Sequence, residues 1–431
     1  MNNPIDINPE FRRALDLLEH TSQNVFITGK AGTGKSTLLE YFRKITAKNI
    51  VVLAPTGVAA VNVEGETVHS FFRFKANVTM DKVSKIKSAK RRKLYSSLDM
   101  IIVDEASMLR ADLLDCVDKF LRLNGKREDR PFGGAQVVFV GDLYQLPPVV
   151  MSEERDVFSG YYRSSYFFDS KVFNGLEIEF VELKKIYRQR DEGFIRILNA
   201  VSDNTVLDEH LKALNRRWEP DADIEGHDYC VYLAPTNALA GNINERMLEK
   251  LTGPANTFSA EIEGEVNEKW LPVDKELRLK QGAQVMLLNN DEKGRWVNGT
   301  VGKITAIVST RPYEAVEVTL ENGETVTVFP HKWEVFRFAL NEDNGVLEAR
   351  PAGKFMQYPL KLAWAITIHK SQGKTFDKVI IDTGNGMFAC GQLYVALSRC
   401  RTLEGIILKK PLRREHIITD HRAAEFLASC Q

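Results

Sequence analysis

The stretch NVFITGKAGTGKSTLLEYF, residues 24–42, decides the fold, because it predicts a strand, a glycine-rich turn and a helix in direct succession. Its turn fits the phosphate-binding pattern G-x-x-x-x-G-K-[ST] with Gly29, Gly34, Lys35 and Ser36. The backbone N–H groups of such a turn, together with the N-terminus of the helix, attract a phosphate group. We expect Lys35 to reach the β- and γ-phosphates and Ser36 to bind Mg²⁺. The remaining residues of the expected phosphate site are Gly32, Thr33 and Thr37.

Two more apolar stretches end in polar side chains, as parallel strands do at the edge of a sheet where ligands bind. The stretch LDMIIVDEASML (98–109) ends in Asp104, which we expect to hold Mg²⁺ through water, and in Glu105. Glu105 would orient or deprotonate an attacking water molecule. The stretch AQVVFVGDLYQLPPV (135–149) brings Gln145 to the same edge. Gln145 is either a sensor of the γ-phosphate or an exposed glutamine in a loop.

A short motif occurs twice, because VVLAPTG (51–57) returns as VYLAPTN (231–237). Both copies follow an apolar run and precede a helix-like stretch, which predicts two copies of one α/β module. Only the first copy carries a phosphate-binding turn, so we expect ATP to lie between the modules. Arg188 and Arg399 would then contact the γ-phosphate from the second module. Taken singly, each arginine is more typical of a surface ion pair, and only together with the repeat does the pattern favour a contact with the γ-phosphate.

Composition limits the class of protein. The 58 basic and 58 acidic residues cancel, so any nucleic-acid surface must come from local arrangement. A chain of 431 residues predicts about three domains. Its five cysteines form no C-x-x-C pair, so we expect neither a structural metal nor a disulfide framework. We found neither a signal peptide nor an apolar run of about 18 residues, so we expect no membrane association.

Together these motifs resemble the superfamily 1 DNA helicases of subgroup B, and within that subgroup the petite integration frequency (Pif) family, with RecD-like helicases as near relatives. The stretches that carry the resemblance are GKAGTGKST, LAPTGVAAVNVEGETVHSFF, IIVDEASML, FGGAQVVFVGDLYQLPPV, YRQ, GAQVMLLNN, VNGTVGKI, LAWAITIHKSQGKTFDKVIID and LYVALSR. The resemblance implies that ATP and Mg²⁺ are the cofactors. It also implies a catalytic set of Lys35, Glu105, Gln145, Arg188 and Arg399.

The implied fold is α/β, with two tandem RecA-like P-loop NTPase domains, a small insertion in the first and a small β-barrel inserted in the second. Between residues 270 and 350 the pattern changes to short strands, and the pairs Asn298-Gly299 and Asn322-Gly323 predict tight turns. The expected bounds are 1–61 and 98–184 for the first domain, 62–97 for the basic insertion, 185–269 and 351–431 for the second domain, and 270–350 for the barrel.

The stretch AITIHKSQGKTF (365–376) ends like a phosphate-binding loop, but Ile368 stands where that pattern requires its first glycine. The resemblance assigns it another task, which is to couple DNA to ATP. Thr367, His369 and Ser371 would face the DNA strand and Gly373 the nucleotide. His369 could instead be a buried histidine with satisfied hydrogen bonds.

The resemblance also implies a DNA track across both modules. Thr56 and Thr236 would each bind one backbone phosphate, and His69 and Ser70 would extend the track. Phe72 would stack on a base, although we expect at least one of the three neighbouring phenylalanines to be buried. Seven basic side chains in DKVSKIKSAKRRK (81–93) are either a solvated face or a contact with duplex DNA at the fork.

The resemblance implies an ATP-dependent DNA helicase and translocase that moves 5′ to 3′ on single-stranded DNA and unwinds forked duplexes, G-quadruplexes and RNA–DNA hybrids in genome maintenance and repair. We expect a monomer in solution, either nucleoid-associated in a bacterial cytoplasm or nuclear in a eukaryote. Two alternatives remain open, an RNA helicase and a nucleotide-gated DNA-binding protein. Phe11 occupies the position where these helicases usually carry a glutamine that reads adenine, so selectivity for ATP is an open point.

Overall fold

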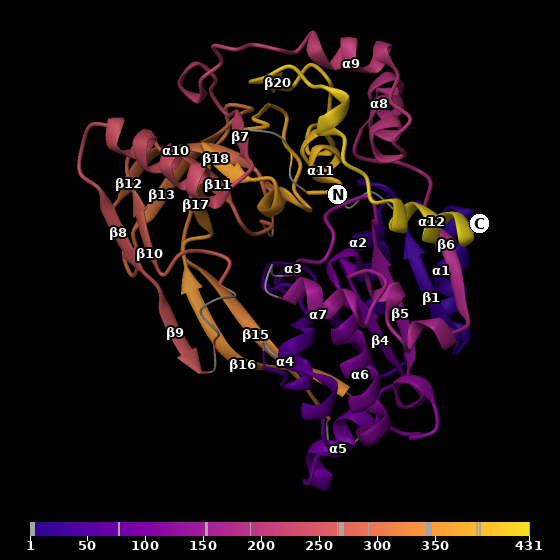
Figure 1. Ribbon diagram of the computed structural model, residues 1–431. Helices are drawn as coiled ribbons and strands as arrows, with labels where there is room; N and C mark the ends of the chain where they lie inside the picture. The colour runs from indigo at the N-terminus through magenta and orange to yellow at the C-terminus, as the bar shows by residue number, and fades with distance from the viewer. Residues whose placement is uncertain are drawn as a thin grey trace.

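The computed structural model describes residues 5–75, 78–150, 154–189, 191–264, 266, 271–291, 293–340, 347–384, 387 and 389–430. It shows two α/β modules and an inserted domain of antiparallel strands, which we call the β domain (Figure 1). The predicted boundary between residues 269 and 270 lies outside the described residues. The architecture is the predicted one, with tandem RecA-like modules and an insertion in each.

The first module is built on a parallel sheet with the strand order β3-β2-β4-β5-β1-β6. Strands β4 and β5 are buried along their whole length, as parallel strands are when helices cover both faces of the sheet. The elements of this module are α1 (Pro9–His20), β1 (Asn24–Thr28), α2 (Lys35–Ile45), β2 (Ile50–Ala54), α3 (Gly57–Asn62), β3 (Glu66–Thr67), α4 (Val68–Phe72), α5 (Ala89–Ser96), β4 (Met100–Val103), α6 (Ala111–Asn124), β5 (Gln136–Gly141), α7 (Arg155–Ser159) and β6 (Ile178–Glu182).

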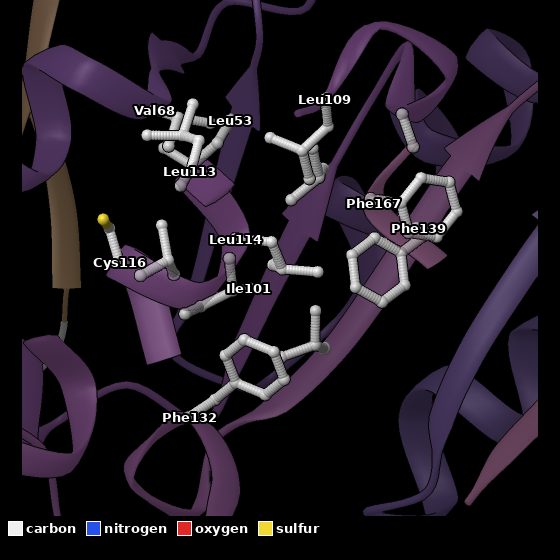
Figure 2. Close-up of a cluster of buried hydrophobic side chains, with 14 of the residues drawn as sticks. Leu53, Val68, Ile101, Leu109, Leu113, Leu114, Cys116, Phe132, Phe139 and Phe167 are labelled. Atoms are coloured by element: carbon white, nitrogen blue, oxygen red, sulfur yellow. The ribbon is translucent and has the colours of Figure 1, made fainter. Parts of the chain in front are cut away.

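Apolar side chains from strands, helices and connecting turns form the main core of the first module. Figure 2 shows part of it, where Ile101 and Phe139 from the sheet lie near Leu113 and Leu114 from α6. The segment after the sheet adds Phe167, whose ring stacks on that of Phe139 with centroids 4.6 Å apart. This packing holds the carboxyl ends of the strands, where the predicted site residues lie.

The second module repeats the pattern on a smaller parallel sheet with the strand order β18-β7-β19-β20. Thr56 follows β2 and caps α3, and Thr236 follows β7 and caps α10 in the same way. The predicted internal repeat is therefore real at the level of structure. The elements are α8 (Glu192–Ser202), α9 (Asp208–Asn215), β7 (Val231–Ala234), α10 (Asn237–Lys250), β18 (Ala365–Thr367), β19 (Val379–Ile381), α11 (Gln392–Ser398), β20 (Ile406–Leu408) and α12 (His421–Ser429).

The β domain has an antiparallel sheet of order β14-β13-β12-β11-β17 and a long hairpin, β15–β16, that reaches the first module at α5 (Figure 1). Both predicted asparagine–glycine turns lie between paired strands, and Gly299 and Gly323 have positive φ there. Its strands are β8 (Asn256–Ser259), β9 (Glu261–Gly264), β10 (Glu276–Leu279), β11 (Gln284–Leu287), β12 (Val301–Val308), β13 (Ala315–Leu320), β14 (Thr325–Val328), β15 (His331–Leu340), β16 (Leu347–Gln357) and β17 (Leu360–Leu362).

Packing departs from the predicted domain bounds at three places. Strand β3, inside the predicted 62–97 insertion, pairs with β2 at the edge of the first sheet. The antiparallel strands extend beyond 270–350 in both directions, from β8 to β17. Helix α12 contributes Ala423, Phe426 and Leu427 to the core of the first module, although the sequence groups it with the second. A separate result concerns membranes, since no described helix has the length and apolarity to cross a bilayer.

Removing the ring of Phe426 should destabilise the first module by about 3 kcal/mol, because the loss of a buried aromatic side chain leaves a cavity in the core. Its ring stacks on Phe168 with centroids 4.1 Å apart, and Arg422 pairs with Asp169 beside it at 2.6 Å. Urea unfolding of Phe426→Ala tests this. Phe329, which is 50% exposed, is the matched control, and Phe329→Ala should cost less than about 0.5 kcal/mol. Equal losses in the two variants would contradict the docking of α12.

Candidate active site

A cavity of about 1070 Å³ lies between the two modules and the β domain. It is lined by every member of the expected catalytic set, namely Lys35, Glu105, Gln145, Arg188 and Arg399. The phosphate-loop residues 31–37 and Gly373 line it as well. Residues from β1, β4 and β5 converge here because these strands are neighbours in one parallel sheet and end at the same edge.

The phosphate loop adopts a conformation that its glycines permit. Gly32 and Gly34 have φ values of +83° and +91°, in the left-handed region that other residues rarely adopt. A Cβ atom on Gly32 would lie 2.5 Å from the Cβ of Arg188, so this glycine also lets the second module approach. Lys35 Nζ donates to the carbonyl oxygens of Gly29 at 2.6 Å and Lys30 at 3.3 Å. The ammonium group therefore sits at the mouth of the loop.

Asp104, which is buried, and Glu105, which is half-buried, form a carboxylate pair at the end of β4. Burial, together with the charge of the neighbouring Glu105, raises the pKa of Asp104 to about 7. Burial also raises the pKa of Glu105, whereas Lys35 and Arg399 oppose that shift. Glu105 has φ +49°, an uncommon conformation for a residue other than glycine and one that is often found at functional sites. Two adjacent carboxylates beside a lysine and a phosphate loop suit a bound cation.

The two arginines are held by backbone carbonyl groups at the junction of the modules. Arg188 Nη1 donates to Ser398 O at 3.3 Å. Arg399 is 1% exposed and donates to Val395 O at 2.9 Å, and to Ser371 O and Lys374 O at 3.3 Å each. Burial lowers the pKa of both groups. In the described part of the chain neither arginine pairs with a carboxylate, so a surface ion pair does not explain Arg399.

Three contacts that the sequence did not predict join the phosphate loop to the second module. Lys30 pairs with Asp203 at 2.9 Å, the N–H of Ala31 donates to Tyr394 OH at 2.9 Å, and the N–H of Tyr187 donates to Gly32 O at 2.8 Å. Tyr394 belongs to the quoted stretch LYVALSR, in a helix that is buried along its whole length. A tyrosine in such a helix needs a hydrogen-bond partner, but only the fold shows which one.

Several predicted DNA-contacting residues have accessible positions. Thr56 and Thr236 are equivalent, since each accepts a hydrogen bond from the backbone of its own helix at 3.3 Å. Ser70 donates to Glu66 at 2.9 Å and is half-buried. His69 and His369 are also half-buried, and burial lowers the pKa of each. Neutral imidazoles are therefore favoured at these two positions.

Three predicted contacts do not have the expected exposure. Phe72 is 2% exposed and packs against Phe120 with ring centroids 5.3 Å apart, so it cannot stack on a base in this structure. Ser371 is fully buried and donates to Ile368 O at 2.6 Å. Thr367 is 4% exposed, and its hydroxyl oxygen accepts from the N–H of Lys370. The two hydroxyl groups shape the turn after β18 instead of facing a strand.

Phe11 is part of a hydrophobic core and is 5% exposed, with its ring edge-on to Tyr41. It offers no polar group to a nucleobase. Three aromatic residues line the cavity, namely Tyr187, Tyr229 and Phe376, and Tyr187 is the one beside the phosphate loop. Tyr187 is 45% exposed and donates through its hydroxyl to Asp6 at 3.0 Å. Its ring lies beside Gly34 and supplies a flat apolar surface.

Comparison with known proteins agrees with this geometry. A family model described as PIF1-like helicase matches residues 7–210, a UvrD-like helicase C-terminal domain matches 362–406, and a Pif1 2B domain matches 266–307. The ATP-dependent DNA helicase Pif1 of Bdellovibrio bacteriovorus is 34% identical over 94% of this chain and 88% of its own length. The chain belongs to the Pif1-like helicase family. As a member of it, the protein is an ATP-hydrolysing DNA helicase.

Relatives differ in how much of their length they share with this Pif1-like chain. PIF1 of Xenopus laevis is 34% identical over 90% of this chain, which covers 59% of the Xenopus protein. The structure of a Bacteroides sp. Pif1 in complex with ADP-AlF4 has a TM-score of 0.91 at 35% identity, with 99% and 97% of the two chains covered. A Bacteroides Pif1 bound to single-stranded DNA has the same coverage and a TM-score of 0.70. The arrangement of the domains in this chain is therefore more similar to that in the ADP-AlF4 complex than to that in the complex with single-stranded DNA.

Proposed function

We propose that this Pif1-like helicase moves 5′ to 3′ along single-stranded DNA and unwinds forked duplexes. The observation that carries the proposal of movement along DNA is the pair of equivalent threonine-capped helices, α3 and α10, one in each module. The 5′-to-3′ polarity rests on the family resemblance. When nucleotide closes the cavity, the distance between the two grips on the strand changes. Related Bacteroides proteins have been solved with single-stranded DNA and at forked double-stranded DNA, which supports these partners.

Each residue of the proposed catalytic set has its own role in ATP hydrolysis. Lys35 contacts the β- and γ-phosphates, Glu105 orients the attacking water and accepts its proton, and Gln145 senses the γ-phosphate. Ser36 and Asp104 would hold Mg²⁺, which neutralises phosphate charge when bound. The carboxylates fit that ion, because a bound cation would keep Asp104 ionised in spite of its raised pKa. Arg188 and Arg399 stabilise the charge that develops on the transferred phosphoryl group.

We extend the proposal to G-quadruplexes, RNA–DNA hybrids and a role in genome maintenance, on the strength of the family resemblance. A strand-displacement assay tests polarity and substrate together. Equal duplexes with a 5′ tail or a 3′ tail should differ, with only the 5′-tailed one unwound. Preferential unwinding from a 3′ tail would refute the polarity, and no ATP-dependent unwinding of either would refute the proposed function.

The double variant Thr56→Ala, Thr236→Ala should weaken binding to single-stranded DNA by about 30-fold, since each lost phosphate contact removes roughly 1 kcal/mol. Fluorescence anisotropy measures this, and nucleotide affinity should stay the same. Each alanine also removes a helix cap, at about 1 kcal/mol of stability. Thr→Ser at both positions is the matched control, because serine keeps both the cap and the hydroxyl. Unchanged DNA affinity in the alanine variant would remove the two-grip mechanism.

A further inference from the structure

Helix α11 lies behind the nucleotide cavity and contacts segments of both modules at its two ends. Gly391, the residue just before it, has φ +70°, and a Cβ atom there would lie 2.3 Å from Tyr144 O and 2.7 Å from Gln145 O. The helix thus begins directly on the backbone of the segment that carries Gln145. The residue after its last turn is Arg399, which donates to the carbonyl groups of Ser371 and Lys374 in the turn after β18. Between these two ends lies Tyr394, on the side of the phosphate loop.

Tyr394 is the first link in a chain of hydrogen bonds that crosses between the modules three times. The N–H of Ala31 donates to Tyr394 OH at 2.9 Å, and Tyr394 OH donates to Asp142 Oδ2 at 3.2 Å. Gln145 Nε2 donates to the same Asp142 oxygen at 3.1 Å. Gln372 Nε2 then donates to Gln145 Oε1 at 3.3 Å. The chain therefore runs from the phosphate loop to the residue beside Gly373 in the turn after β18.

The direction of these bonds is set by burial. Tyr394 is 3% exposed, Asp142 1% and Gln145 6%, so unpaired groups would be costly there. Burial and the charge of Asp142 raise the pKa of Tyr394, so its hydroxyl keeps the proton. That single proton goes to Asp142, and the oxygen lone pairs remain for the N–H of Ala31. A shift of the phosphate loop that breaks the Ala31–Tyr394 bond would change the environment of a buried hydroxyl group and thereby the bond from that hydroxyl to Asp142.

We propose that Tyr394 is a positioning residue that couples the state of the phosphate loop to Gln372, by way of Asp142 and Gln145, and through Gln372 to the turn after β18, where the half-buried His369 is the predicted DNA contact. The proposal rests on the proposed function, in which DNA stimulates turnover. When the γ-phosphate is lost, the phosphate loop moves and the Ala31–Tyr394 hydrogen bond changes. The side chains of Gln145 and Gln372 then change their positions together. In the opposite direction, a strand bound at the turn orders Gln145 for hydrolysis.

The test compares Tyr394→Phe with the wild type in the ratio of kcat with saturating single-stranded DNA to kcat without DNA. Phenylalanine keeps the ring and removes only the hydroxyl, so the ratio should fall about tenfold, the size expected for one hydrogen bond to a charged group. Tyr232→Phe is the matched control, since Tyr232 OH donates to Asp382 at 2.7 Å inside the same module. Tyr232→Phe should lower the melting temperature by about as much as Tyr394→Phe does. It should leave the ratio of kcat with DNA to kcat without DNA unchanged.

A double-mutant cycle with Gln372→Ala separates coupling from simple packing. Among the described residues, the hydrogen bonds that join Tyr394 to Gln372 pass through Asp142 and Gln145. The chain predicts non-additive effects, with the double variant little worse than either single one. Additive effects, or a ratio in Tyr394→Phe within twofold of the Tyr232→Phe control, would overturn the proposal.

Two further outcomes are distinguishable. If wild-type turnover does not respond to DNA, the proposed function fails before the variants are compared. If Tyr394→Phe does not fold, Gln372→Ala alone carries the test, because Gln372 is only half-buried. A reduced ratio in that variant supports the chain, and a wild-type ratio overturns it.

Discussion

Glu105→Gln should lower kcat for ATP hydrolysis by about 10²- to 10⁴-fold, because the amide cannot accept a proton from the attacking water. Nucleotide affinity should change little, since the phosphate loop and Lys35 remain. The substitution is close in shape and removes one of two adjacent like charges, Asp104 being buried and Glu105 half-buried, so the melting temperature should not fall. Steady-state turnover and binding of a fluorescent ADP analogue measure the two quantities separately.

Glu179→Gln is the control for this variant. Glu179 lies on β6 and pairs with Arg13 at the surface at 3.1 Å, so its loss should cost less than about 1 kcal/mol and leave turnover intact. If Glu105→Gln kept wild-type turnover, the general base would have to be another group.

Arg399→Ala should reduce kcat by about 10³-fold, in the range known for arginine fingers. The same change frees the carbonyl groups of Ser371 and Lys374, so DNA stimulation should decline together with turnover. Arg399→Lys restores the charge but not the fork of donors, and it should recover only a small part of the activity. Rapid chemical-quench measurements of a single turnover report the hydrolysis step itself.

The control for Arg399→Ala is Arg413→Ala. Arg413 pairs with Glu415 at 3.4 Å, and its side chain is 71% exposed. Turnover in that variant should equal the wild type. A single-turnover rate in Arg399→Ala within tenfold of the wild type would show that Arg399 acts only in packing.

Local patterns were enough to predict the parts of the fold that local chemistry determines. The phosphate loop, the asparagine–glycine turns and the threonine-capped helices each follow from residue types at fixed spacing. Exposure could not be predicted in the same way. In ETVHSFFRF the two adjacent phenylalanines look alike, and only the packing of α6 and Tyr95 shows that both are buried.

Contacts between distant segments were the other missing part. Helix α12 returns to the first module because Phe168, some 250 residues earlier, offers it a ring to stack on. Tyr394 meets Ala31 and Asp142 only after both modules have folded and docked. Side-chain hydrogen bonds of this kind depend on tertiary geometry, for which one sequence carries no period or spacing.

The central claim is that two modules convert ATP hydrolysis into movement on DNA. It is tested most directly by steady-state ATP turnover of the wild type alone, with single-stranded DNA, and with RNA of the same sequence. We predict strong stimulation by DNA and little by RNA. Equal stimulation by RNA would favour an RNA helicase, and turnover unaffected by either nucleic acid would contradict the account.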